Sequence, residues 1–158
     1  MTPKVIVPLR ALIMVLLLLA LAAQALVPLA AREAATMAPE LSSLQVPYAV
    51  AGIATIACGQ VVLVAIWPLL TRVHRGAIFD VGAFRWVGVM IGAGVVATTL
   101  ILLLTAHVLF VVQQGPVTVP LVLLGGCAAG AAFTLLMVVM RALLRSAVAM
   151  RAELAEVI

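Results

Sequence analysis

Long stretches without a charged residue constrain this chain more than any other feature. Asp, Glu, Lys and Arg are all absent from residues 11–31, 41–71 and 86–140. An apolar helix of about 20 residues is long enough to cross the hydrocarbon core of a bilayer. We therefore expect an all-α fold, an integral membrane four-helix bundle that forms one transmembrane domain over residues 1–158. The predicted spans are 11–31, 47–70, 86–112 and 119–140.

Composition supports a membrane protein and argues against a soluble one. Hydrophobic residues make up 67% of the chain and charged residues only 9%, whereas soluble domains carry about 25% charged residues. The mean hydropathy is +1.39. The net charge of +4 does not indicate direct nucleic-acid binding, because the basic residues flank the spans instead of forming a stripe on one face.

The basic residues predict the orientation of the spans. Eight of the nine lie in the amino-terminal segment, the connector 71–85 and the tail 141–158. The predicted outer loops, 32–46 and 113–118, hold only Arg32. By the positive-inside rule, both termini are expected in the cytoplasm.

The first segment is open to a second interpretation. Small residues spaced as in a signal-peptidase site occur at 20–22 and 23–25. Its uncharged run, however, is long enough to span the bilayer, so we favour a retained first span over a cleaved signal peptide.

No motif in the sequence indicates an enzyme. Patterns for redox cysteines, zinc proteases, dinucleotide binding and P-loops are absent, and no nucleophile is paired with a base. Cys58 and Cys127 lie inside apolar runs, where a thiol behaves as a small hydrophobic group. We therefore expect no catalytic activity, no cofactor and no metal site.

Two glycine pairs predict close helix packing. Gly88 and Gly92 in the third span, like Gly126 and Gly130 in the fourth, are spaced so that both glycines lie on one face. Packing within a single bundle is our preferred interpretation. Dimerisation through these faces is the alternative.

Three polar residues, Gln24, Gln60 and His107, form a candidate intramembrane polar cluster. Gln24 and His107 lie at a similar distance from the outer ends of their spans, and polar groups in hydrocarbon need partners. We expect a hydrogen bond between them. The alternatives are a ligand or proton site that uses His107 with Gln60, and a histidine that simply reaches water.

The tail 141–158 has the pattern of an amphipathic helix with a heptad-like seam. The same spacing of apolar residues begins upstream at Leu136 and Met140, so span four is expected to continue into the cytoplasm as one helix. Packing on the connector or the headgroup surface could cover this seam, and so could a protein partner or a second copy. The seam residues are Leu143, Ala147, Met150, Leu154 and Val157. The candidate docking surface comprises Arg72, Arg75, Arg85, Leu143, Met150, Arg151, Glu153, Leu154, Glu156 and Val157.

Three segments resemble a known family. Residues 70–79, 84–87 and 151–158 are similar to the small bacterial membrane proteins grouped as domain of unknown function 2975. The resemblance implies a four-span protein of the bacterial cytoplasmic membrane, frequently encoded beside a small helix-turn-helix regulator. It implies no known activity.

Together these patterns favour a non-enzymatic membrane anchor or regulatory interaction protein. Its expected partners are the lipid bilayer and a cytoplasmic protein such as a helix-turn-helix regulator, with a homo-oligomer left open. The alternative is a small oligomeric transporter or export component, similar in size to four-span multidrug transporters. Those transporters use a membrane-embedded glutamate for proton coupling, and no acidic residue lies within the predicted spans of this chain.

Overall fold

The protein is built from four long helices. A computed structural model describes residues 3–37, 39–74, 81–113 and 117–156. Two short segments, the 3-10 helix η1 and the π-helix η2, complete the element order. The elements are α1 (Pro3–Met37), η1 (Pro39–Leu44), α2 (Gln45–His74), α3 (Val81–His107), η2 (Val108–Val112) and α4 (Thr118–Glu156).

Each long helix contains an apolar stretch long enough to cross a membrane. Among the described residues, the buried apolar side chains are few, while large apolar side chains are exposed along all four helices. Exposing such an apolar surface to water is unfavourable, whereas contact with the apolar lipid tails carries no such cost. The chain is therefore a multi-pass membrane protein. The apolar stretches are Val7–Thr36, Ser42–Thr71, Phe84–Val112 and Thr118–Met150.

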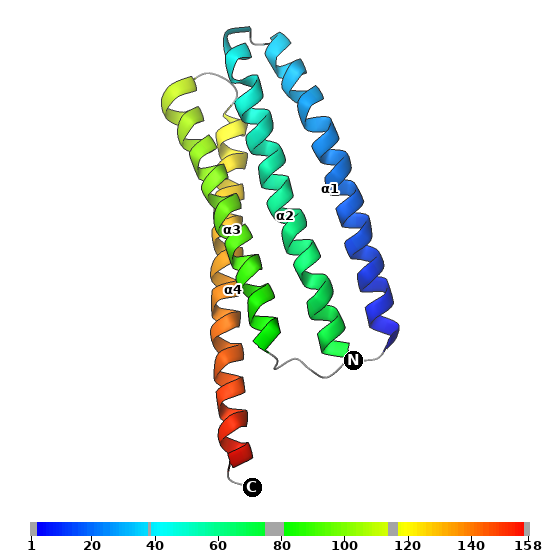
Figure 1. Ribbon diagram of the computed structural model, residues 1–158. Helices are drawn as coiled ribbons and strands as arrows, with labels where there is room; N and C mark the ends of the chain where they lie inside the picture. The colour runs from blue at the N-terminus through cyan, green and yellow to red at the C-terminus, as the bar shows by residue number, and fades with distance from the viewer. Residues whose placement is uncertain (1–2, 38, 75–80, 114–116, 157–158) are drawn as a thin grey trace.

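The helices pack in the order in which they follow one another along the chain. Extensive contacts between the described helices join α1 to α2, α2 to α3 and α3 to α4. Figure 1 shows α1, α2 and α3 side by side, with α4 behind α3 and the two chain ends at the same end of the bundle. The result is an open four-helix bundle in which α2 separates α1 from α3.

The predicted outer loop at 32–46 is wrong in its conformation. Helix α1 continues to Met37, η1 occupies Pro39–Leu44, and α2 begins directly at Gln45. Residues 33–37 include two alanines and a glutamate, which favour helix continuation. Helix α1 ends at Met37 and η1 begins at Pro39, as helices usually end at or before the residue that precedes a proline.

The carboxyl-terminal end of α3 follows the sequence prediction. The helix ends with a π-helical turn in which the Gln113 N–H donates to the Val108 carbonyl oxygen at 3.1 Å. Gln113 has a φ of 47°, in the left-handed region, and this conformation stops the helix. The third span therefore ends at Val112, as expected from the polar residue that follows it.

Helix α4 confirms that span four and the tail form one helix. It runs without interruption from Thr118 to Glu156. Within the predicted connector 71–85, α2 extends to His74 and α3 begins at Val81, while residues 75–80 lie outside the described part.

Candidate functional site

A cluster of Arg10, Trp67 and Thr71 joins α1 to α2 at the end of the bundle that carries both chain ends. The guanidinium carbon of Arg10 lies 5.5 Å from the centroid of the Trp67 ring, within the range of a cation–π attraction. Its Nη2 donates to Thr71 Oγ1 at 3.2 Å, and that hydroxyl donates to the Trp67 carbonyl oxygen at 3.1 Å. The Arg10 Nε is buried without a hydrogen-bond partner among the described residues. The guanidinium is thus held in one orientation by two neighbours.

A second polar contact joins the same two helices farther along α1. Gln24 Nε2 donates to the Ile53 carbonyl oxygen at 3.3 Å. Gln60 Nε2 donates to Gln24 Oε1 at 3.2 Å. Both amides are half-buried, so each supplies the other with a partner that hydrocarbon does not offer.

A third contact joins α2 to α3. The Tyr48 hydroxyl and His107 Nδ1 are 2.7 Å apart, and the two rings meet edge to face, with an interplanar angle of 72°. In the tautomer that carries its proton on Nε2, the imidazole accepts a hydrogen bond from the phenol hydroxyl at Nδ1. His107 is also the last residue of α3 before the π-helical turn.

The predicted hydrogen bond between Gln24 and His107 is wrong. Gln24 contacts Gln60, and His107 contacts Tyr48. The similar depth of Gln24 and His107 did not bring them together, because α2 lies between their helices. Sequence reasoning missed Tyr48 as the partner of His107, although its place at the start of α2 puts it at the same end of the bundle as His107.

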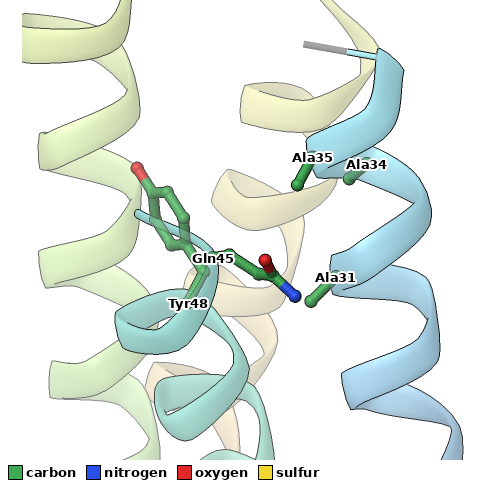
Figure 2. A pocket seen from close by; sticks show the side chains of 5 residues that line it. All are labelled: Ala31, Ala34, Ala35, Gln45 and Tyr48. Atoms are coloured by element: carbon green, nitrogen blue, oxygen red, sulfur yellow. The ribbon is translucent and has the colours of Figure 1, made fainter. Parts of the chain in front are cut away.

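A small pocket lies beside Tyr48, between α1 and α2. Figure 2 shows Gln45 directed toward the α1 alanines, and Tyr48 turned the other way, toward α3. The pocket volume is about 120 Å³, below the roughly 300 Å³ from which typical ligand pockets begin. Among the described residues, no three His, Cys, Asp or Glu side chains lie close enough to share a metal ion. The pocket-lining residues are Ala31, Ala34, Ala35, Gln45 and Tyr48.

Helices α3 and α4 approach each other through two glycines and two threonines. A Cβ on Gly94 would lie 2.7 Å from Thr134 Oγ1, and a Cβ on Gly130 would lie 2.5 Å from Thr98 Oγ1. Each threonine hydroxyl donates to a carbonyl of its own helix, Thr98 to Gly94 and Thr134 to Gly130, both at 2.8 Å. The sequence contains the same Gly-x-x-x-Thr spacing on both helices, which the glycine-pair prediction overlooked.

The predicted role of the glycine pairs is correct for only one of them. Gly126 would contact Ile101, and Gly130 lies at the close approach described above. Gly88 and Gly92 have no neighbouring atom within 4 Å of an added Cβ. Their face of α3 is turned away from the neighbouring helices, so this pair does not pack within the bundle.

The same contacts fix where α4 leaves the bundle. Because Gly94 faces Thr134 and the two helices are antiparallel, each step forward along α3 corresponds to a step back along α4. This register places Val81, the first residue of α3, level with Ala147. Helix α4 therefore continues for about 9 residues, or about 13 Å, past the start of α3. Figure 1 shows this projecting segment, residues 148–156, beyond the ends of α2 and α3.

Several arginines share one level of the bundle. Thr71, which Arg10 contacts, lies level with Phe84 in the register set by the hydrogen bond between α2 and α3. Phe84 in turn lies level with Leu144 in the register of α3 and α4. The other arginines with described side chains within about one helical turn of this level are Arg85, Arg141 and Arg145.

The seam predicted on the tail is exposed at two of its three positions with described side chains. Leu143 is 61% exposed and Met150 is 59% exposed, whereas Ala147 is half-buried. Arg85, from the same candidate docking surface, is also exposed. The remaining members have side chains outside the described part of the structure: Arg72, Arg75, Arg151, Glu153, Leu154, Glu156 and Val157.

Comparison with known families gives one match. A family model described as Protein of unknown function (DUF2975) matches residues 29–158. No curated protein and no solved structure is significantly similar to the chain.

Proposed function

Because the chain belongs to the DUF2975 family, whose description assigns no activity, we propose a function from the geometry: a non-enzymatic membrane anchor that holds a regulatory protein at the cytoplasmic face of a bacterial cytoplasmic membrane. The main supporting observation is the projecting segment of α4 with the exposed Met150, together with the exposed Leu143 one heptad before it on the same seam. The proposed docking surface is the candidate set from the sequence, with this seam on α4 and Arg85 at the start of α3 as its described members.

The chemistry of the seam favours a helical partner. Leu143, Ala147 and Met150 follow the spacing with which one helix packs along another. Beyond the level of the arginines, the exposed Met150 side chain reaches the end of the apolar stretch of α4, where exposure to water is unfavourable until a partner covers it. A helix-turn-helix regulator, the neighbour that the family resemblance implies, offers helices for this contact.

The charge distribution supports a cytoplasmic position for the docking surface. The arginines gather at the end of the bundle from which α4 projects, while Arg32 lies near the other end of α1. Basic residues flanking membrane spans are retained on the cytoplasmic side. A DNA-binding regulator would therefore meet the docking surface in its own compartment.

The polar contacts within the membrane support a structural role over transport. Gln24 and Gln60 bond to each other, and Tyr48 bonds to His107. A transport site needs polar groups that are available to a substrate, whereas these groups are already bonded to one another. Their mutual hydrogen bonds explain how these four polar side chains can lie in hydrocarbon, and no ligand is needed for that explanation.

Truncation after Ala147 tests the proposal, because the cut leaves the contacts between α3 and α4 in place. The probe is the helix-turn-helix protein encoded beside the chain, co-purified from membranes in a gentle detergent. We expect the full chain to retain it and the truncated chain to lose it while staying in the membrane fraction. Equal retention by both forms would contradict the proposal, as would no retention by the full chain.

Point variants separate the seam from the rest of the tail. Replacing Leu143 and Met150 with glutamate should reduce retention of the regulator at least about 10-fold, because a charge would have to be buried in the contact. Ala142 and Ala149 are exposed positions off the seam, so the same two glutamates placed there serve as the matched control. Equal losses in both pairs would show that added charge, not the seam, determines binding.

A further inference from the structure

We propose that Arg10, Trp67 and Thr71 form a binding site for the phosphate of an anionic phospholipid, between α1 and α2 at the arginine-bearing end of the bundle. This Arg10 site lies on helices other than the projecting segment of α4, so it does not depend on the docking proposal.

The position of the guanidinium favours an anion. Trp67 lies against the guanidinium, and Thr71 accepts a single hydrogen bond from Nη2. The Thr71 hydroxyl donates its own hydrogen bond to the Trp67 carbonyl oxygen. The hydrogen bonds of Thr71 are therefore satisfied within the protein. No described residue accepts a hydrogen bond from the other Nη donors of Arg10, and a planar guanidinium matches two oxygens of a phosphate.

The charge of Arg10 has no counterpart among the described side chains. The one acidic residue whose side chain is described is Glu33, which lies about 35 Å away along α1. Arg85, Arg141 and Arg145 add further positive charge at the level of Arg10. A cation that is half-buried beside hydrocarbon is costly without a counter-charge, and the Arg10 Nε is already unpartnered.

The depth of the site identifies the anion as a lipid headgroup. Tryptophan rings favour the boundary between hydrocarbon and headgroups, and the register of α2 and α3 places Trp67 and Trp86 at nearly the same depth. Leu9 and Leu12, next to Arg10 on α1, are exposed apolar side chains and suit acyl chains. Phosphatidylglycerol supplies a phosphate with a net negative charge, whereas phosphatidylcholine carries its own cation.

Lipid retention by the purified full chain tests the site. Native mass spectrometry would compare retained phosphatidylglycerol with phosphatidylcholine of the same acyl chains. We expect the wild type to prefer phosphatidylglycerol, and Arg10→Gln to reduce this preference about 10-fold, as for the loss of a charge-assisted contact. Arg145→Gln removes the same charge at the same level from an exposed position, and should change the preference less than about 2-fold.

The conservative variant covers the case in which Arg10→Gln does not fold. Arg10→Lys keeps the charge but loses the planar fork, and should reduce the preference about 3-fold. The site is refuted by an unchanged preference in Arg10→Gln, or in Arg10→Lys if only that variant folds. Equal losses in Arg10→Gln and Arg145→Gln would refute it in favour of diffuse attraction. Displacement of phosphatidylglycerol by millimolar inorganic phosphate would refute the lipid in favour of a soluble anion.

Discussion

The interfaces on the two sides of α3 are built in different ways. Toward α2, the His107 imidazole bonds to the Tyr48 hydroxyl across the interface. Toward α4, Gly94 and Gly130 let the backbones approach, and the facing threonine hydroxyls bond within their own helices. One interface is held by a polar contact between helices and the other by close packing.

The difference shows two solutions to one physical problem. Lipid tails are as apolar as leucine, so burying apolar surface does not drive helices together in a membrane. Helices in lipid associate through close packing or through hydrogen bonds that hydrocarbon does not replace. The interface of α3 with α4 should therefore respond to side-chain volume, and the interfaces among α1, α2 and α3 to the loss of a polar partner.

The largest effect is expected for Gly130→Ala. The new Cβ would lie 2.5 Å from Thr98 Oγ1, so either the Thr98 side chain must rotate or the two helices must move apart. We expect the free energy of unfolding in mixed micelles to fall by about 1 to 3 kcal/mol. Gly59→Ala is the matched control, because nothing lies within 4 Å of that position.

A compensating substitution sharpens this prediction. Thr98→Ala removes the hydroxyl that the new methyl group meets, and the hydrogen bond of that hydroxyl to Gly94 is internal to α3. The double variant should recover most of the lost stability. If it is no more stable than Gly130→Ala alone, the close approach of the two helices is not what the methyl group disturbs.

A smaller effect is expected for Gln24→Leu. This side chain donates to the Ile53 carbonyl and accepts from Gln60, so its loss leaves the Gln60 amide without a partner in hydrocarbon. We expect unfolding to become about 1 to 2 kcal/mol easier. Gln60→Leu should cost less, because Gln24 keeps its bond to Ile53.

Replacing both glutamines at once distinguishes the cost of leaving one amide without a hydrogen-bond partner from the cost of lost packing. Removing both amides leaves no unsatisfied group, so Gln24→Leu with Gln60→Leu should cost less than the sum of the single changes. Strict additivity of the two costs would show that the amides do not interact in the membrane.

Features confined to one helix could be predicted from the sequence, because they depend on neighbours along the chain. The seam through Met140, Leu143 and Met150 predicted that span four and the tail form one helix, and α4 runs without interruption to Glu156. The end of the third span followed from the polar Gln113 in the same way. Such patterns need no knowledge of which helices touch.

Contacts between helices could not be predicted in the same way. Gln24 and His107 were matched by depth alone, but depth says nothing about whether α2 lies between them. Gly88 and Gly92 have the spacing of a packing motif, but the sequence does not say which face of α3 meets α4. Gly94 was not singled out from the sequence, and its contact with Thr134 became recognisable only once the register of the two helices was known.

Tyr48→Phe should have a modest effect, since it removes one hydrogen bond and keeps the ring. Loss of the contact to His107 Nδ1 should reduce the free energy of unfolding by about 0.6 kcal/mol, the average for such bonds between membrane helices. Thr99→Val is the control, because its hydroxyl bonds only within α3. A cycle with His107→Phe measures the coupling directly, and zero coupling would contradict a hydrogen bond across this interface.

The smallest effect is expected where α3 meets neither neighbour. Gly88 and Gly92 have open space around an added Cβ, so alanine at either position should change the free energy of unfolding by less than about 0.5 kcal/mol. Leucine at both positions should likewise leave the mass of the detergent-solubilised particle unchanged in light scattering, because lipid accepts the larger side chains. A fall to a smaller particle would instead show that a second copy packs on this face. In that case α3 would have a third interface, built by close packing like the one with α4.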